Sequence, residues 1–315
     1  WSSVLNNYSY NVPLERYAGP GHWNDPDFLI TGDSGLTSAE TQSQMSLWAE
    51  MAAPLISSTD LTKLSPEALA ILGNQQIIAV DQDNNLVLST RAGFVYLNTT
   101  TGELSDIVPA PYDTTIVRFN DGRVDPAGRF WVGTMYEPRD QPKAEMYVLD
   151  KGALRLAWSG GMTNSNGLGF SPDGRTMYHS DTTSHRVDAY DYDVKTGTAS
   201  NRRNLVTFPD DKKAADYGGR PDGAAVDSEG NYWSAMYEGG RIVKLSPTGE
   251  LLQEIELPVR CPTSVAFGGP DLRTLYVTSA SKGRSNDELA KYPHSGKVLA
   301  FAVDVPGVEQ AEYRG

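Results

Sequence analysis

The sequence is poor in the residues that build most metal and redox centres. It holds one cysteine, Cys261, and four histidines among 315 residues. A single cysteine excludes an intramolecular disulfide framework and a cysteine zinc cluster, and the histidines lack paired metal-ligand spacing. We expect Cys261 to be a small apolar core residue and the histidines to be structural or surface residues.

Long apolar runs and an excess of positive charge are also missing. No stretch of about 18 apolar residues could form a membrane span. The chain carries 40 acidic and 27 basic residues, a formal net charge of -13. This balance disfavours binding to the phosphate backbone of nucleic acids and to anionic membranes. We expect a soluble protein that binds neither nucleic acid nor membrane.

Helix and strand patterns alternate in the first 84 residues. Residues 37–40 (TSAE) are a capping box, and apolar residues follow at helical spacing until Pro54. A Ser-Pro start and a glycine end predict a second helix over residues 65–73. Short apolar runs at 27–30 and 55–58 predict strands. The order strand, helix, strand, helix indicates parallel α/β architecture.

Four segments of this part carry a family resemblance. They are 19–27 (GPGHWNDPD), 46–55 (SLWAEMAAPL), 64–67 (LSPE) and 78–83 (IAVDQD). Together they resemble the last two βα units of the α-galactosidase family, retaining glycosidases on a (β/α)8 barrel. The resemblance implies that residues 1–84 are a barrel fragment, with Asp27 and Phe28 as the remnant of the sugar pocket.

This fragment lacks the carboxyl pair that glycoside hydrolysis needs. A retaining glycosidase uses two carboxyl groups about 5 Å apart, and the resemblance places both upstream of Trp1. Asp25 and Asp27 are an alternative pair, because residues two apart in a strand share a face. Both would then lie on one side of the sugar, so we interpret them as turn or pocket-wall residues. Two βα units also cannot close a barrel.

From residue 85 onward the pattern changes to short strands separated by Gly, Pro, Asp and Asn, which favours a mainly β fold. A polar turn followed by an aromatic strand recurs, and each copy is flanked by further strands. The copies are 125–131 (DPAGRFW), 171–178 (SPDGRTMY), 227–233 (DSEGNYW) and 268–276 (GGPDLRTLY). Four strands per repeat predict the blades of a β-propeller.

Aligning the repeats brings four polar residues to one equivalent position: Asn120, Asn166, Asp222 and Thr263. The innermost strands of a propeller line its central channel, so equivalent positions form a ring at the channel mouth. A ring of oxygen donors predicts a site for a hard cation. Because Asn-Gly and Asp-Gly are also common tight-turn sequences, a turn role remains the alternative for each residue.

Further motifs carry a second resemblance: 118–122 (RFNDG), 124–129 (VDPAGR), 165–168 (SNGL), 221–223 (PDG) and 275–278 (LYVT). They resemble the senescence marker protein, gluconolactonase and regucalcin family. The resemblance implies a six-bladed propeller that hydrolyses sugar lactones with one divalent metal ion, which could be Ca, Zn, Mn or Mg.

The resemblance also implies roles for particular residues. Asn166 and Asp222 would be metal ligands, and Arg118 and Asn120 would contact the substrate. Asp222 would also act as the catalytic general base, because a carboxylate can accept a proton from water. Arg118 offers a planar fork of donors to substrate oxygens. Glu137 is a weaker substrate-contact candidate, since the family's acidic residue aligns at Pro138.

The chain departs from the family at its start. The family's third protein ligand is a glutamate in the first blade, and no motif here matches it. We therefore expect residues 85–315 to be an incomplete six-bladed propeller that lacks its first blade and part of the second. Exposed strand edges would favour self-association. Neither part indicates a compartment clearly, although the propeller part favours the cytoplasm.

Three functions follow from these readings. The first is metal-dependent hydrolysis of a sugar lactone, impaired if the missing glutamate is needed. The second is a non-catalytic propeller that binds a cation or a sugar. The third is an α-galactosidase-like fragment without its catalytic carboxyls. Two partial folds that meet near residues 83–85 without a linker are also what a chimera would produce.

Overall fold

The computed structural model describes residues 1–12, 29–31, 35–50, 55, 61–73, 86–98, 103–214, 217–269 and 271–315. The chain divides into two compact units. Unit 1 is Trp1–Leu88 with Phe94–Pro109, and unit 2 is Ser89–Gly93 with Ala110–Gly315. The predicted boundary at residues 84 and 85 lies outside the described residues.

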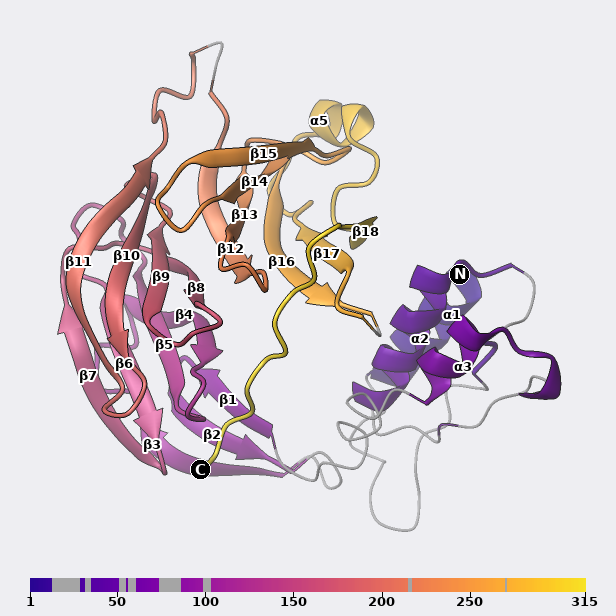
Figure 1. Cartoon of the computed structure of the whole chain (residues 1–315), viewed down its shortest axis with the longest axis horizontal. Coiled ribbons are helices and arrows are strands. Elements are labelled where there is room, and N and C mark those ends of the chain that lie inside the picture. Colours follow the sequence, from indigo (N-terminus) through magenta and orange to yellow (C-terminus); the bar gives the residue numbers. More distant parts are fainter. Residues whose placement is uncertain are drawn as a thin grey trace. The chain divides into compact units, whose positions relative to one another are not determined.

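Unit 1 contains α1 (Ser2–Asn11), α2 (Ser38–Glu50), the short 3-10 helix η2 (Leu61–Lys63) and α3 (Pro66–Leu72) (Figure 1). The predicted starts of α2 and α3 are confirmed. Thr37 and Glu40 bind each other's backbone N–H groups at 2.9 and 3.2 Å, as a capping box requires. The Ser65 hydroxyl accepts the N–H of Ala68 at 3.1 Å. Helix α1 was not predicted, because it buries one residue and so shows no periodicity.

The core of unit 1 joins its three α-helices. Val4, Leu29, Met45, Trp48 and Ile71 are buried together. The prediction that α2 faces a core is thus confirmed through Met45 and Trp48. The pocket residues Asp27 and Phe28 lie outside the described residues, as do residues 51–54 and 56–58. The barrel fragment therefore stays a prediction.

A three-stranded sheet of β1 (Leu86–Thr90), β2 (Gly93–Leu97) and β3 (Leu104–Pro109) follows in the sequence. Antiparallel sheets then follow one another in chain order through unit 2 (Figure 1). The first comprises β4 (Val117–Val124), β5 (Phe130–Tyr136), β6 (Glu145–Asp150) and β7 (Ala153–Ser159). The second comprises β8 (Ser165–Phe170), β9 (Thr176–Asp181), β10 (Arg186–Asp193) and β11 (Thr198–Thr207). The third comprises β12 (Arg220–Val226), β13 (Tyr232–Tyr237), β14 (Arg241–Leu245) and β15 (Leu251–Glu256).

The last sheet has three strands in the described residues: β16 (Pro262–Gly268), β17 (Thr274–Ser279) and β18 (Leu299–Ala302). A short helix, α5 (Asn286–Lys291), lies between β17 and β18 and was not predicted. The mainly β character is confirmed, and each predicted repeat is the turn between the first two strands of one sheet. The count of six blades stays a prediction.

Successive sheets of unit 2 pack face to face through alternate residues of their strands. On β13, Tyr232 and Met236 join the core shared with β9–β11, whereas Trp233 joins the core shared with β16–β18. Side chains of neighbouring strand residues point to opposite faces, so one strand serves two cores. The first strands β4, β8, β12 and β16 are consequently neighbours, as a propeller requires (Figure 1).

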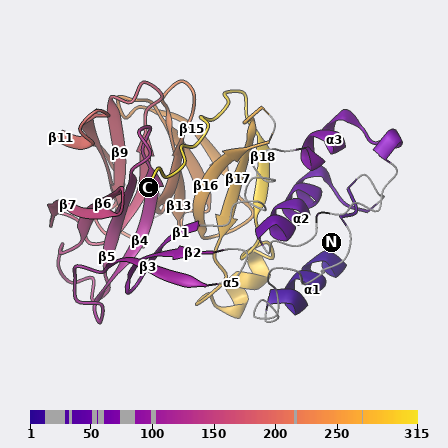
Figure 2. The same cartoon turned by 90° about the horizontal axis from the view of Figure 1, so that it is seen from below.

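The C-terminal segment, residues 303–315, runs along the ends of these sheets, and Figure 2 shows the C-terminus beside them. It contacts the turns that follow the first strands: the Ser228 N–H binds the Pro306 carbonyl, and the Arg314 N–H binds the Gly128 carbonyl, both at 2.9 Å. It also lines a cavity of about 130 Å³ with Arg123 and Pro172. This segment therefore covers the ends of the first strands that lead into these turns, and Asn120 lies nearer to the opposite end of β4.

Within the described residues, no helix has the length and apolar character needed to span a membrane.

Candidate functional site

Each first strand of unit 2 carries a register irregularity near its start. Pairing shifts between Phe119 and Gly122 on β4, between Asn166 and Gly169 on β8, between Pro221 and Ala224 on β12, and between Pro262 and Ser264 on β16. An irregularity of this kind adds residues to one strand, redirects its side chains and is common next to active sites. Asn120, Asn166 and Asp222 all lie at or beside these irregularities.

Two of the predicted site residues are in direct contact. Asn120 Nδ2 donates to Asn166 Oδ1 at 2.9 Å and to the Ser165 carbonyl at 2.7 Å. Asn166 Nδ2 donates to Thr182 Oγ1 at 2.7 Å, and that hydroxyl donates to the Pro221 carbonyl at 2.7 Å. Because its nitrogen is held by Thr182, the amide oxygen of Asn166 faces Asn120. The same hydroxyl links Asn166 to the residue before Asp222.

The Asp222 carboxyl lies in a charged environment at the start of β12. Burial, with a smaller contribution from the neighbouring Asp121 carboxylate, raises the pKa of Asp222 to about 7. Asp121 is itself held by the N–H groups of Gly122 at 2.9 Å and Leu168 at 3.3 Å. A carboxyl with a pKa near neutrality can take up and release a proton at physiological pH.

The glycines beside these residues are needed for close packing inside strands. A Cβ on Gly167, which has φ +56°, would lie 2.1 Å from the Tyr232 hydroxyl. A Cβ on Gly223 would lie 2.4 Å from Ser264 Oγ. Asn166-Gly167 and Asp222-Gly223 therefore form strand irregularities, and the tight-turn interpretation does not hold for them. Thr263, the fourth residue of the predicted ring, binds Thr278 in its own sheet at 2.8 Å.

Arg118 lies at the start of β4, two residues before Asn120. Its Nη1 donates to the Phe119 carbonyl at 2.9 Å, and its Nε lies 3.5 Å from Glu137 Oε1. Arg91 binds both oxygens of Glu137, at 2.6 and 3.0 Å. Glu137 therefore acts as an anchor for two guanidinium groups, and Arg118 keeps about a third of its surface exposed for a ligand.

The donor set fits an oxygen-preferring divalent cation. Asn166 and Asp222 supply an amide oxygen and a carboxylate oxygen, which are the ligand types that calcium and magnesium take. In the part of the chain that the structure describes, no group of three or more His, Cys, Asp or Glu side chains forms a metal cluster. These two residues would therefore provide a partial coordination shell.

Sequence reasoning missed Asp121, Arg123 and Thr182, which contact the backbone or side chains at the irregularities of β4, β8 and β12. Asp121 and Arg123 are two residues apart on β4, so the alternation of strand residues could have grouped them on one face. Thr182 follows β9 and carries no motif of its own, so its contact with Asn166 shows only in the fold.

A buried histidine lies directly beside the site. His179 Nε2 and Ser165 Oγ are 2.9 Å apart, and both side chains are fully buried. Burial lowers the pKa of His179 from its ordinary 6.5 to about 4, because the charged imidazolium loses its hydration. His179 is thus buried and uncharged at neutral pH, and the expectation that the histidines are structural or surface residues stays a prediction for its role.

We expect His179 to destabilise the fold in acid. Its folded pKa lies below its unfolded pKa, so unfolding takes up a proton, and stability falls as the pH drops from about 6.5 towards 4. The loss attributable to His179 is on the order of 3 kcal/mol. In urea unfolding, the free energy of unfolding should fall less between pH 7 and pH 4 for His179→Gln than for the parent chain. His294→Gln, which changes an exposed histidine, should keep the parent's drop.

The family model described as "SMP-30/Gluconolactonase/LRE-like region" matches residues 35–281, more than half of the chain. The chain belongs to the SMP-30/gluconolactonase/LRE-like family. The match begins upstream of residue 84, within the segment that resembles a glycosidase barrel. The family resemblance proposed for residues 85–315 is thus confirmed, while the glycosidase resemblance stays a prediction.

Relatives in the family span most of the chain. A 6-deoxy-6-sulfogluconolactonase of Pseudomonas putida is 41% identical over 273 residues, covering 86% of this chain and 91% of that protein. Regucalcin of Xenopus laevis is 35% identical over 245 residues, covering 76% and 80%. These proteins show the family and not the activity of this chain.

Solved structures agree with the family assignment. A calcium-binding regucalcin of Agrobacterium tumefaciens superposes with a TM-score of 0.68 at 28% identity, covering 74% of this chain and 77% of that one. A luciferin-regenerating enzyme superposes with a TM-score of 0.64 at 33% identity, covering 73% and 78%. Both likenesses support a propeller architecture for unit 2.

Proposed function

We propose that this chain hydrolyses a sugar lactone with one divalent cation held by Asn166 and Asp222. The observation that carries the proposal is the contact between Asn120 and Asn166 beside Asp222, at matching irregularities of neighbouring first strands. Membership of the gluconolactonase family supports it, as does the name of the 41% identical relative.

In this proposal each side chain has a defined task. When bound, a divalent cation would polarise the lactone carbonyl and make a water molecule easier to deprotonate. Asp222 accepts a proton from the attacking water, whose oxygen bonds to the carbonyl carbon. The ring C–O bond breaks, and the proton passes to the departing ring oxygen. Arg118 and Asn120 donate hydrogen bonds that orient the sugar oxygens.

A rate measurement tests the proposal. Glucono-δ-lactone should be hydrolysed faster than its spontaneous rate when calcium, manganese, magnesium or zinc is added, and a chelator should return the rate to background. An unchanged rate with every metal would refute the activity. Cleavage of a nitrophenyl α-galactoside would instead support the glycosidase alternative, for which Asp27 and Phe28 remain the proposed pocket residues.

A binding function without turnover is the second candidate. It is favoured by the partial donor set, since Asn166 and Asp222 supply one amide oxygen and one carboxylate, and no group of three or more His, Cys, Asp or Glu side chains forms a metal cluster in the described residues. Calorimetry that detects cation binding, lost in Asp222→Ala, together with no lactone hydrolysis would select this function. The self-association predicted from open strand edges is tested by sedimentation of the same preparation.

A further inference from the structure

Arg123 reaches from β4 to the two strands that hold the proposed metal ligands. Its Nε donates to the Leu168 carbonyl on β8 at 2.7 Å, and its Nη2 donates to the Ala224 carbonyl on β12 at 2.8 Å. The two carbonyls come from different sheets, and Ala224 is 101 residues away in the sequence. One side chain therefore joins the first strands of three sheets.

The two carbonyls occupy equivalent positions. Leu168 is two residues after Asn166, and Ala224 is two residues after Asp222. First strands are sheet edges, so on the side away from their partner strand their N–H and C=O groups lack ladder partners. Arg123 binds a carbonyl of this kind two residues after each proposed ligand.

Asp121 completes this arrangement from the same face of β4. Its carboxylate accepts the N–H of Leu168 at 3.3 Å while Arg123 binds the carbonyl of that residue. Both the N–H and the carbonyl of Leu168 are thus bound by side chains of β4. The segment of β8 that carries Asn166 is consequently fixed against β4 and not only within its own sheet.

We infer that Arg123 is a positioning residue that sets the separation of Asn166 and Asp222. A guanidinium is a rigid planar fork, so two of its nitrogens hold the two carbonyls at a fixed spacing. Lysine, a single ammonium on a flexible stem, cannot impose that spacing. The inference rests on the proposed function in one respect, namely that Asn166 and Asp222 hold a cation together.

The third contact of Arg123 leads to the C-terminal segment. Its Nη1 donates to Oε1 of Gln310, which is 187 residues away. Gln310 belongs to the segment that closes over the strand ends and lines the adjacent cavity. This contact uses the guanidinium nitrogen that binds neither carbonyl. Gln310→Ala leaves both carbonyl contacts intact and should therefore change cation affinity little.

The test measures cation affinity by calorimetry with Mn²⁺ and Ca²⁺ on the full chain. Replacing a residue that orients metal ligands typically weakens affinity about 10- to 100-fold, and we expect this for Arg123→Met. For lactone hydrolysis, the loss should be relieved in part by raising the metal concentration. Arg123→Lys should fold, keep one carbonyl contact and show an intermediate affinity.

Arg129→Met is the matched control. Arg129 is a buried arginine that binds the Asp125 carboxylate at 2.7 Å and the carbonyl of Val194, so it also joins two sheets. Its contacts lie in the turn after β4 and not beside the proposed ligands. We expect Arg129→Met to lower the unfolding temperature and leave the cation affinity of the folded protein within twofold of the parent.

The outcomes separate the inference from the proposed function. Cation affinity within twofold of the parent in folded Arg123→Met, or in Arg123→Lys if the first variant does not fold, would overturn the inference. Equal weakening in Arg129→Met would overturn it too, because the effect would then follow stability alone. A parent chain that binds no cation would overturn both. A parent that binds a cation without hydrolysing a lactone would overturn only the activity.

Discussion

Asp222→Asn is expected to reduce kcat/KM for lactone hydrolysis about 1,000-fold. The substitution removes the proposed general base, which typically contributes 10²- to 10⁴-fold. It also removes the single carboxylate of the proposed donor set and so weakens cation binding. The measurement is the steady-state rate with glucono-δ-lactone at saturating metal, with spontaneous hydrolysis subtracted.

Loss of the fold can be distinguished from loss of chemistry in this variant. Burial raises the pKa of Asp222 to about 7, so above pH 7 the ionised carboxyl opposes folding in the metal-free chain. Asp222→Asn removes that charge and should unfold at the same or a higher temperature than the parent at pH 8. Such a gain in stability at the expense of activity is typical of functional residues.

Asp193→Asn provides the matched control for activity. Asp193 is an exposed carboxylate at the end of β10 that accepts the N–H of Lys195 at 2.8 Å. The Asp193→Asn variant makes the same Asp-to-Asn change outside the proposed site and should keep the parent's kcat/KM. If Asp222→Asn retained more than about a tenth of the parent's rate, Asp222 would not be the general base.

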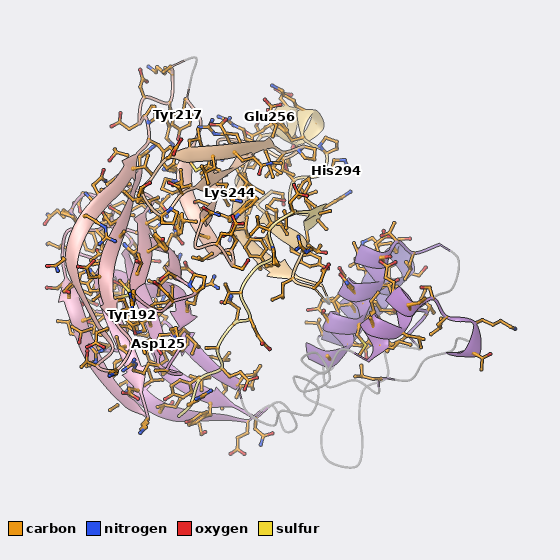
Figure 3. All side chains as sticks on the ribbon, viewed as in Figure 1. Asp125, Tyr192, Tyr217, Lys244, Glu256 and His294 are labelled. Carbon is orange, nitrogen blue, oxygen red and sulfur yellow. The ribbon has the colours of Figure 1, made fainter. Side chains whose placement is uncertain are left out.

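Asp227→Ala is expected to lower the free energy of unfolding of unit 2 by about 3–5 kcal/mol. The Asp227 carboxylate is fully buried and accepts the indole N–H of Trp233 at 3.0 Å. It also pairs with Lys244 Nζ at 3.2 Å. Asp227→Ala leaves the charge of Lys244, whose side chain is only 12% exposed, without its partner, and the loss of one partner of a buried pair costs this much in other proteins. Figure 3 labels Lys244 on the third sheet.

The measurement for Asp227 is equilibrium unfolding in urea, followed by tryptophan fluorescence. Asp271→Ala is the matched control, because Asp271 belongs to the corresponding turn after β16 but is exposed and accepts the Arg273 N–H at 3.1 Å. It should cost about 0.5–1 kcal/mol. Equal losses in both variants would show that the buried contacts of Asp227 with Trp233, Asn231 and Lys244 add no more stability than the exposed turn contact of Asp271.

A second turn contains the same arrangement of a buried aspartate bound to a tryptophan and a basic side chain. Asp125 is fully buried, accepts the indole N–H of Trp131 at 3.3 Å and binds Arg129 at 2.7 Å. It also accepts the hydroxyl of Tyr192, 67 residues away, and Figure 3 shows the two side chains close together. The repeated Asp and Trp of the sequence motif are therefore linked in both turns.

Local patterns in the sequence predicted the repeats, the mainly β character and the starts of α2 and α3, but not the helices α1 and α5. The polar turns at 125–131 and 227–233 and the aromatic strands after them form hairpins in the structure. The capping box at Thr37 and Glu40 forms as predicted. Each of these features depends on residues within about ten positions of one another, so the sequence displays it directly.

The equivalence of Asn120, Asn166 and Asp222 was also readable, because a repeated unit places matching positions on matching strands. Their surroundings were not. The shifts of register, the contact of Asn166 with Thr182 and the close approach of Gly167 to Tyr232 depend on how neighbouring strands pack. The turn interpretation of Asn-Gly and Asp-Gly failed for the same reason.

What the sequence by itself determined is the family, the mainly β fold and the shared position of the proposed ligands. Only the tertiary structure decided which side chains hold those ligands in place. Arg123 meets Ala224 and Gln310 across 101 and 187 residues. No local pattern encodes such contacts, because they exist only after the sheets have packed side by side and brought their first strands together.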